Sequence, residues 1–420
     1  MTEPSPRPEE WSLADFYLGE GDDPTVPPEG FAEWRRATAW AASLYEPSLL
    51  GPPVPRTRLD SGHAERAVIN LSSYNYLGLA QHPETVAAAQ EALALYGTGA
   101  CGSPILSGMT DLHRRLENRL SEFLGRESTM LFSSGFGGAL GSLSGLLRRD
   151  DVAVLDSRAH ASLLDGAKLS QARVELFEHN DPVSLDAALD RWKGRRRLVV
   201  VEGVYSMDGD MADLPRLLEV TSQHSVAVLI DEAHSLLVCG AHGGGVTEHF
   251  GAQGRIGLLY GTMSKALAGI GGFVSGRAAT LDYLRLYANP YGYSCALPPG
   301  VVAAMIRGLE IATRDDTLRR RLWDNADYFR AQVQQLGLSV GASTTHVVPI
   351  IIGDDRALLY TLGHEMLARG LFLAPVDFPS VPQDKVRFRA AITAAHSRAD
   401  LDEALNIIED TIARRLRDAA

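Results

Sequence analysis

Short apolar runs and polar, helix-like segments alternate along the middle of the chain. The runs are rich in valine and leucine without a regular exchange for polar residues, which is typical of strands buried on both faces. Strands and helices that alternate in this way predict a mainly parallel α/β sheet. The predicted strands cover residues 129–132, 152–156, 173–177, 197–202, 226–234, 257–262 and 271–276.

The flanking segments have other patterns. Residues 1–10 are predicted to be disordered, and the clearest helix of the following stretch spans 30–45. A helix over 82–97 has proline near its start and glycine just after its end, as helices commonly do. Near the C-terminus, a helix over 298–314 leads into mixed helices and strands, including 346–352 and 386–393.

These patterns divide the chain into three parts. We expect an N-terminal arm over 1–65, a large α/β domain over 66–300 and a smaller α+β domain over 301–420. The composition is that of a soluble globular protein, with 45% hydrophobic and 22% charged residues. A net charge of −12 argues against nucleic acid as a partner. The basic run RWKGRRR at 191–197 is either a solvated loop or a binding patch.

The cysteines and the N-terminus indicate the compartment. Cys101, Cys239 and Cys295 are too few and too scattered for a disulfide framework or a metal site. The N-terminus has no apolar signal core. No apolar run approaches the roughly 20 residues that a membrane helix needs. We therefore expect a cytoplasmic protein without a transmembrane segment.

Polar residues gather at the ends of the predicted strands. In open parallel sheets, ligands bind beyond the carboxyl ends of the strands, so these residues are the candidates for chemistry. The candidates, in chain order, are Ser134, Gly135, Phe136, His160, Glu202, Ser206, Asp231, His234, Thr262, Ser264 and Lys265.

Lys265 is one of only four lysines in a chain that otherwise uses arginine. A desolvated lysine amine can form a Schiff base, whereas a guanidinium stays protonated. A small Gly/Ser-rich turn at a helix N-terminus can bind a phosphate, and an acidic residue can hold a protonated pyridine nitrogen. Each feature alone has a plain alternative, such as a surface lysine or a helix cap. Together, and in this order, they specify pyridoxal 5'-phosphate (PLP).

A series of motifs runs along the chain in the order SSYNYLGL, FSSGF, HAS, EGVYSMDGD, DEAHS, GTMSKALAGIGGF, PYGYSCALPP and RFRAAITAAH. Their order resembles that of the α-oxoamine synthases. These are fold-type I PLP enzymes that condense an amino acid with an acyl thioester and release CO2. The resemblance covers about residues 68–400 and looks most like the serine palmitoyltransferase branch. It implies an α/β fold-type I transferase with a mainly parallel seven-stranded sheet.

The resemblance also implies a role for each candidate residue. Lys265 would form the Schiff base and act as acid and base at the substrate Cα. Asp231 would pair with the pyridinium nitrogen, His234 would hydrogen-bond the ring oxygen, and His160 would stack on the ring. The other cofactor-binding residues, mostly around the phosphate, would be Ser134, Gly135, Phe136, Ser206, Thr262, Ser264 and, from the partner subunit of a homodimer, Ser294.

The implied substrates are an L-amino acid and an acyl thioester of coenzyme A or acyl carrier protein. Serine is favoured, and alanine or glycine is possible. The products would be an α-amino ketone, CO2 and a free thiol. The homodimer would share its active sites between subunits. The candidate substrate-binding residues are Tyr74, Asn75, Arg387 and Arg389.

Three positions depart from the family pattern. Asp377 stands where an arginine usually binds the amino-acid carboxylate, and an aspartate would repel that group. Three explanations are open. Another cation binds the carboxylate, with Arg387 and Arg389 the nearest in sequence, or the substrate is a different one. Alternatively, the loop is shifted and Asp377 faces solvent. On the acyl side, Pro104 replaces a common arginine and Ala139 a usual asparagine, and both would reshape the thioester entrance.

Other functions share some of these features. An aminotransferase or carbon–carbon lyase of the same fold would share Lys265 and Asp231, but not the motifs DEAHS, HAS and TAAH in this order. A non-catalytic partner subunit would lack the Schiff-base lysine, which this chain keeps. A Rossmann dehydrogenase is excluded because no GxGxxG follows the first strand.

Overall fold

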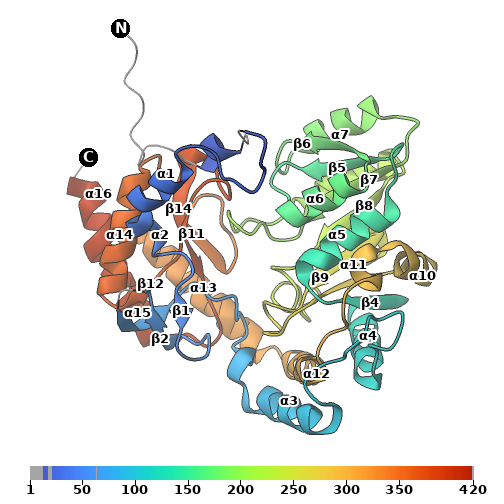
Figure 1. Ribbon diagram of the computed structural model, residues 1–420, viewed down its shortest axis with the longest axis horizontal. Coiled ribbons are helices and arrows are strands. Elements are labelled where there is room, and N and C mark those ends of the chain that lie inside the picture. Colours follow the sequence, from blue (N-terminus) through green and yellow to red (C-terminus); the bar gives the residue numbers. More distant parts are fainter. Residues whose placement is uncertain (1–12, 18–20, 63, 419–420) are drawn as a thin grey trace.

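The computed structural model describes residues 13–17, 21–62 and 64–418. The predicted disorder of residues 1–10 lies outside these ranges. The chain forms two lobes that lie side by side in Figure 1. Below them in that view, α3 (Pro83–Tyr96) packs beside α12 (Pro299–Arg314), close to the helices that the sequence predicts at 82–97 and 298–314.

A seven-stranded sheet forms the centre of the larger lobe in the described chain, with the order β4-β10-β9-β8-β7-β5-β6. The strands β5 to β9 run parallel, and β10 is antiparallel to its neighbours β4 and β9. The predicted mainly parallel sheet is confirmed. Its strands are β4 (Ser128–Phe132), β5 (Val152–Asp156), β6 (Arg173–Phe177), β7 (Arg197–Glu202), β8 (Ala227–Asp231), β9 (Leu258–Thr262) and β10 (Gly272–Gly276).

Helices cover both faces of this sheet. Val152 and Val154 of β5 pack into one hydrophobic core, while Ala153 and Leu155 pack into a second core on the other face. Because both faces are buried, these strands carry continuous apolar runs. One face is covered by α5 (Gly135–Leu146), α6 (Ala161–Leu169), α10 (Ala278–Tyr287) and α11 (Asn289–Gly292). The other is covered by α12, α4 (Asp111–Leu124), α7 (Pro182–Arg191) and α8 (Leu214–Gln223).

The smaller lobe has its own core. Its antiparallel sheet has the order β11-β14-β13, with β11 (Val347–Gly353), β13 (Pro375–Val376) and β14 (Val386–Ala391). The helices that contribute to this core are α13 (Thr317–Gln335), α14 (Arg356–Ala368) and α15 (Arg398–Ile408). Two short helices complete the description. Val246 of α9 (Val246–His249) packs in the core of the larger lobe, and Leu416 of α16 (Arg414–Asp418) packs against the core of the smaller lobe.

A third sheet joins the two ends of the chain. It contains β1 (Ser48–Leu49), β2 (Arg56–Asp60), β3 (Glu65–Asn70) and β12 (Leu371–Phe372), and β3 runs parallel to β12. Ile69 of β3 packs in the core of the smaller lobe. The predicted domain boundary at residue 66 falls within β3, and the domain boundaries stay predictions.

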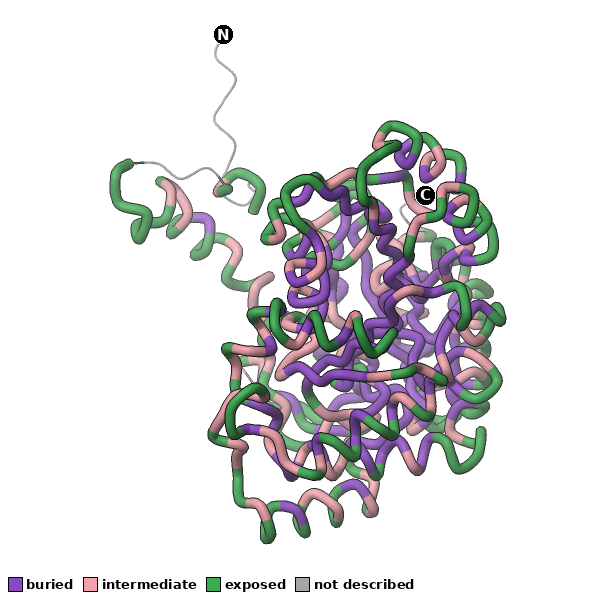
Figure 2. The backbone as a smooth tube through the Cα atoms, turned by 90° about the vertical axis from the view of Figure 1, so that its right-hand side faces the viewer, coloured by how far each residue is buried: buried purple, intermediate pink, exposed green. Residues whose placement is uncertain are grey.

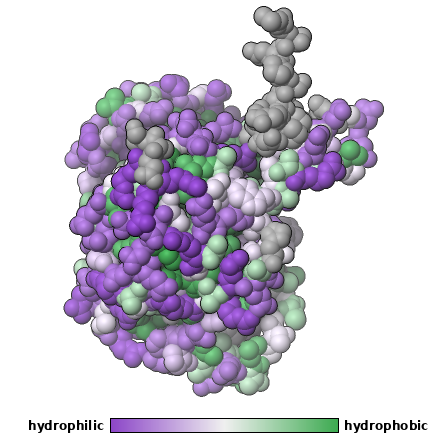
Figure 3. Space-filling view, turned by 90° about the vertical axis from the view of Figure 1, so that its left-hand side faces the viewer, coloured by the Kyte–Doolittle hydropathy of each residue, from purple (hydrophilic) through white to green (hydrophobic). Residues whose placement is uncertain are grey.

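The arm contains two helices where the sequence predicts one over 30–45. These are α1 (Phe31–Ala37) and α2 (Ala39–Ala42), separated at Thr38, whose hydroxyl bonds to the carbonyl of Trp34 at 2.8 Å. Trp34 is buried against the rings of Phe16 and Phe31. The segment around α1 stands away from the body of the molecule (Figures 2 and 3). By contrast, α2 contacts α14, because the ring of Trp40 stacks on His364 with ring centres 4.3 Å apart.

The basic run at 191–197 leads into the amino-terminal end of β7, whereas Lys265 follows the carboxyl end of β9. Arg195 lies 3.3 Å from Asp150, and Arg196 lies 3.2 Å from Asp151. These ion pairs favour the interpretation as a solvated loop. Among the described residues, no helix is long and apolar enough to cross a membrane.

Candidate active site

Lys265 lies in the turn that connects β9 to β10. The turn folds back on itself, because Met263 N–H donates to Gly271 O and Gly269 N–H donates to Met263 O, both at 2.9 Å. Gly271 has φ 111°, and a Cβ there would lie 2.8 Å from Phe132 O. The turn joins two antiparallel strands, in agreement with the strands predicted at 257–262 and 271–276.

Two carboxylates stand side by side at the ends of neighbouring strands. Glu202 ends β7 and pairs in register with Asp231, which ends β8, and both are buried. Burial raises the pKa of each, while the nearby amine of Lys265 opposes the shift. Burial in turn lowers the pKa of Lys265, against the pull of both carboxylates. Asp231 accepts a hydrogen bond from Ala233 N–H at 2.8 Å.

Two histidines approach the same region from separate loops. His234 follows β8 and is buried, and its Nδ1 lies 2.8 Å from the hydroxyl of Tyr76. His160 follows β5 as the N-cap of α6, and its Nδ1 lies 2.7 Å from Ser162 Oγ. Since these contacts fix one nitrogen of each ring, the ring orientations are set by the protein. The nearby amine of Lys265 contributes, after burial, to lowering the pKa of both histidines.

The start of α5 has the features of a phosphate site. The helix is 12 residues long and begins at Gly135, after the N-cap Ser134, whose Oγ accepts from Gly137 N–H at 2.9 Å. A Cβ at position 135 would lie 2.6 Å from Thr262 Oγ1, so the strand end and the helix start require glycine there. Thr262 Oγ1 lies 2.8 Å from Ser264 Oγ. Free amides and two hydroxyls at a helix N-terminus suit an anion.

The remaining cofactor candidates lie at the edges of this region. Phe136 follows Gly135 and is 49% exposed. Ser206 lies in the loop after β7, where its carbonyl accepts from Arg389 at 3.3 Å. Ser294 precedes Cys295, whose carbonyl accepts from Ser133 Oγ at 2.5 Å, so it flanks the start of α5.

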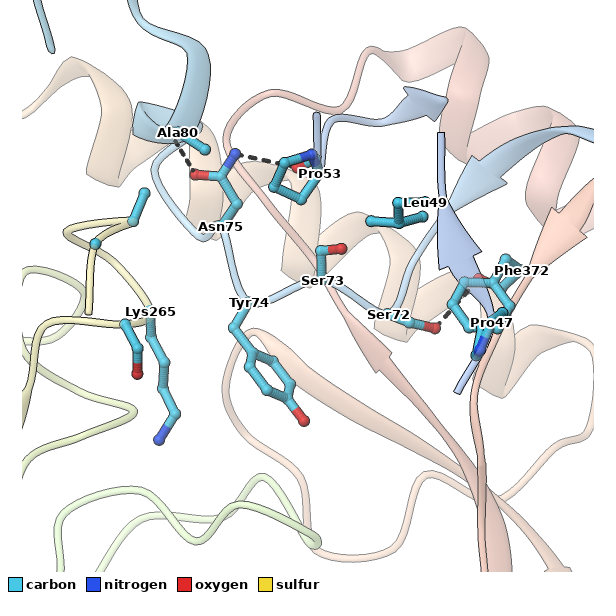
Figure 4. Close-up of a pocket in the computed structure, with 13 residues that line it drawn as sticks. Pro47, Leu49, Pro53, Ser72, Ser73, Tyr74, Asn75, Ala80, Lys265 and Phe372 are labelled. Atoms are coloured by element: carbon cyan, nitrogen blue, oxygen red, sulfur yellow. Dashed lines mark hydrogen bonds between the residues drawn. The ribbon is translucent and has the colours of Figure 1, made fainter. Parts of the chain in front are cut away.

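The four substrate-binding candidates are held differently. Asn75 is buried, and its side chain bonds to Pro53 O and Ala80 N–H, both at 3.2 Å. In Figure 4 it points away from the side toward which Lys265 and Tyr74 extend. Arg389 donates to the Tyr74 hydroxyl, and its guanidinium lies 4.8 Å from the centre of the Tyr74 ring.

Arg387 and Arg389 are both buried, but only Arg387 has a carboxylate partner. Arg387 pairs with Asp208 at 2.8 Å and donates to two carbonyls. Arg389 forms no ion pair within the described residues. It contributes to lowering the pKa of Lys265, so its charge reaches the amine.

A cavity of about 500 Å³ opens beside Lys265 (Figure 4). Its apolar lining comes mostly from the arm and from β12, which the figure shows on the side opposite to Lys265. These residues are Pro47, Leu49, Pro53 and Phe372.

The described residues fit PLP as a set. At the ends of β8, β9 and β4 they supply four groups. These are a buried, partly deprotonated amine, a buried carboxylate, a histidine with a free ring nitrogen, and an anion site at a helix start. These are the groups that an aldehyde, a pyridine nitrogen, a ring oxygen and a phosphate require.

Comparisons with known proteins agree with this geometry. A model of the family described as aminotransferase class I and II matches residues 66–408. The 8-amino-7-oxononanoate synthase of Thermoanaerobacter pseudethanolicus is 38% identical over 363 residues, which are 86% of this chain and 91% of the relative. The serine palmitoyltransferase of Sphingobacterium spiritivorum is 38% identical over 342 residues, which are 81% of this chain and 85% of the relative.

A solved structure supports the same assignment. Serine palmitoyltransferase from S. paucimobilis with a bound PLP–myriocin aldimine has a TM-score of 0.87 at 30% identity. The match covers 93% of this chain and 98% of that chain. The chain belongs to the aminotransferase class I and II family.

Within this family the protein is an α-oxoamine synthase. It uses PLP to condense an amino acid with an acyl thioester, with loss of CO2. The resemblance inferred from the motifs is confirmed, and the relatives do not favour an aminotransferase or a lyase.

The structure decides one of the alternatives for Asp377. This residue is buried, so the alternative in which it faces solvent is wrong. Its carboxylate pairs with Arg356 and accepts from the Tyr360 hydroxyl at 3.0 Å. Its negative charge is therefore compensated within the smaller lobe.

Two side chains near the site were not among the sequence candidates. Tyr76 bonds to His234, and His346 lies edge-on against Tyr76 with ring centres 4.2 Å apart. Tyr76 lies within the motif SSYNYLGL, which was a signal for it. His346 is the first residue of the predicted strand 346–352 and follows a polar stretch, and nothing in its sequence context marks it as a site residue.

Proposed function

We propose that the amino acid binds with its carboxylate on Arg389 and its Cα beside Lys265. Serine is the favoured amino acid, and alanine and glycine follow. The likeness to serine palmitoyltransferases in sequence and in structure supports serine. The observation that carries the proposal is a buried arginine near Lys265 whose charge has no carboxylate partner among the described residues.

The partners of Arg389 are all neutral. They are the Tyr74 hydroxyl and ring, the Ser206 carbonyl at 3.3 Å and Met207 Sδ at 3.6 Å. A buried charge without a counter-charge is costly. An incoming carboxylate supplies that counter-charge and can be held by two parallel hydrogen bonds from one guanidinium. Arg387 is already neutralised by Asp208, so it is the weaker candidate.

The cofactor would be held by residues from four loops. Asp231 would pair with the ring nitrogen, His234 would bond the ring oxygen through Nε2, and His160 would stack on the ring. When bound, PLP stabilises the negative charge that develops at the substrate Cα. The phosphate would be held by the Gly135 and Phe136 amides at the start of α5, with the hydroxyls of Thr262 and Ser264. Ser134 and Ser206 would contribute elsewhere to the cofactor site.

Lys265 would move the proton at Cα. Its lowered pKa makes the neutral, proton-accepting amine available at a lower pH than in a free lysine. The deprotonated carbon then attacks the thioester carbonyl, and the thiol leaves. After the carboxyl group departs as CO2, Lys265 returns a proton to the carbon. These steps give the α-amino ketone.

The cavity beside Lys265 supports an apolar acyl group. Its apolar wall begins where the amino-acid site ends, so a chain attached to the reacting carbonyl can lie along it (Figure 4). The thioester itself can come from coenzyme A or from a carrier protein.

The active unit would be a homodimer in which Ser294 serves the partner's site. Large apolar side chains on the loops beside the start of α5 are exposed, and exposed apolar clusters mark interfaces. They are Ile105 (50% exposed), Leu106 (83%), Phe136 (49%) and Tyr293 (86%). A second copy of the chain would cover them.

A titration of the purified holoenzyme with single amino acids tests the proposal. Visible absorbance of the cofactor reports the exchange of Lys265 for the substrate amine, and Lys265→Ala is the blank. We expect saturable shifts with serine, followed by release of thiol and CO2 when an acyl thioester is added. A response to a different amino acid would correct the substrate. The absence of any cofactor absorbance in the wild type would overturn the role of Lys265.

A further inference from the structure

We propose that Tyr76 fixes the tautomer of His234, so that His234 carries its proton on Nε2 and donates it toward the cofactor. The inference rests on the proposed function, in which Nε2 of His234 meets the ring oxygen of PLP. Tyr76 would act through His234 and is therefore a positioning residue.

The contact between the two side chains allows two assignments. The Tyr76 hydroxyl lies 2.8 Å from His234 Nδ1, and either atom can hold the shared proton. If the hydroxyl donates, Nδ1 is the acceptor and the ring proton sits on Nε2. If Nδ1 donates, the proton is on Nδ1, and Nε2 can only accept.

The surroundings of Tyr76 favour the first assignment. Tyr76 is 1% exposed, and its hydroxyl has no second partner within the described residues. Were Nδ1 the donor, the phenolic hydrogen would be buried without an acceptor, which is costly. The phenol does not escape this by ionising, because burial raises the pKa of Tyr76 far above its ordinary value.

The surroundings of His234 lead to the same tautomer. Burial, together with the positive charges of Lys265 and Arg389, lowers the pKa of His234 well below its usual range. The ring is therefore neutral and has a single N–H. With Nδ1 accepting from Tyr76, that N–H is on Nε2, which has no hydrogen-bond partner among the described residues. A histidine whose other nitrogen is fixed in this way has a defined tautomer.

Tyr76 is itself held in place from the smaller lobe. Its carbonyl accepts from Ala394 N–H at 2.7 Å, and its ring meets His346 at 79°. His346 is fully buried, and burial lowers its pKa to about 3, so it brings no charge to the pair. His346 supports the Tyr76 ring and makes no hydrogen bond to its hydroxyl. The hydroxyl is thus left to His234.

Tyr76→Phe tests the inference, because it removes the hydroxyl and keeps the ring. Protein labelled with 15N-histidine reports the tautomer through long-range 1H–15N correlations, and the signal lost in His234→Gln assigns His234. We expect Nε2–H in the wild type and a mixture of tautomers in Tyr76→Phe. Tyr328→Phe is the matched control, since that hydroxyl bonds to Asp402 away from the site. Nδ1–H in the wild type, or pure Nε2–H in Tyr76→Phe, would overturn the inference.

The absorbance of the holoenzyme provides the second readout. Loss of a donor to the ring oxygen should shift the cofactor spectrum toward the form with a protonated ring oxygen, and weaken PLP binding by roughly threefold or more. An unchanged spectrum despite mixed tautomers would refute an action through the ring oxygen. The tautomer can also be measured without cofactor. If the proposed PLP site is wrong, the tautomer test remains valid, and the absorbance measurement shows the failure of the site independently.

Discussion

Arginine and aspartate side chains around the site are distinguished by their partners. Arg387 is neutralised by Asp208, and Arg356 is neutralised by Asp377. Arg389 keeps neutral partners and an uncompensated charge. Position 377 thus supplies no cation, and Arg389 is a buried arginine that forms no ion pair among the described residues.

Arg389→Gln should therefore weaken binding of the amino acid without removing the cofactor. Loss of hydrogen bonds between charged groups lowers affinity by about tenfold to a hundredfold. The dissociation constant, obtained from the absorbance titration, measures this effect, and the spectrum of the unliganded holoenzyme shows that the cofactor is retained.

Asp377→Asn is the matched comparison. It breaks the pair with Arg356, so the free energy of unfolding should fall by about 1–3 kcal/mol. The amino-acid affinity should stay within about twofold of the wild type, because the residue acts within the smaller lobe. An equal loss of affinity in both variants would show that Asp377 also faces the substrate.

At this scale the sequence was informative where chemistry restricts the residue type. Lys265, Asp231 and the two histidines follow predicted strands, and their residue types suit one cofactor. The partners of Asp377 could not be predicted, because only the tertiary fold brings Arg356 and Tyr360 next to it. Tyr76 was missed for the same reason.

At the scale of elements, one partly buried histidine joins two of the loops that form the site. His179 Nδ1 lies 2.9 Å from Asp156, which ends β5 before the His160 loop. His179 Nε2 lies 2.8 Å from Asp210, in the loop that contains Ser206. A doubly protonated ring can donate to both carboxylates, whereas a neutral ring can donate to only one. Its charge therefore ties the two loops together.

This bridge makes stability depend on pH. The two carboxylates, opposed by burial, raise the pKa of His179 to about 9 from 6.5. The stabilisation is complete below pH 6.5, declines as pH rises and is lost above pH 9, because the native state binds the extra proton. It amounts to about 3 kcal/mol.

Urea unfolding of the wild type and of His179→Asn between pH 6 and pH 10 measures this contribution. The difference between the two proteins should shrink toward high pH. His224→Asn is the control, since the partner of His224, Asp186, is half exposed. A difference for His179→Asn that stays constant over the whole range would contradict the bridge.

Elements were predicted well where their pattern is local. The apolar runs of β4 to β10 identified the strands of the large sheet, because burial on both faces removes polar positions from most of them. The edge strand β6 is the exception, since it is half exposed and carries Arg173 and Glu175. The sheet β1-β2-β3-β12 was not predicted. In β2, the sequence RTRLD carries charged residues on its exposed face, and β12 has two residues that pair with β3 from the far end of the chain.

At the scale of the whole molecule, the site draws on both lobes. Lys265, Asp231 and His160 come from the large sheet, whereas Arg389 lies on β14 and the cavity wall includes β12. The arm that contributes Pro47 and Leu49 to this wall also includes α2, whose Trp40 stacks on His364, and α1, which stands away from the body (Figure 2). Exposed apolar side chains lie at the start of α5 and on the loops beside it.

Complementation between two inactive variants tests whether the sites are shared. Lys265→Ala removes the amine, and Ser294→Asp places a negative charge where the phosphate of the partner's site would lie. If Ser294 serves the partner, a mixed dimer holds one site with both defects and one intact site. Random pairing of the co-expressed variants then restores about one quarter of the wild-type activity. If Ser294 serves its own subunit, every site carries one defect and no activity returns.

Each variant expressed alone supplies the baseline, and sedimentation of the mixture shows that dimers have formed. If dimers form but activity does not return, the interface is supported and Ser294 does not serve the partner's site.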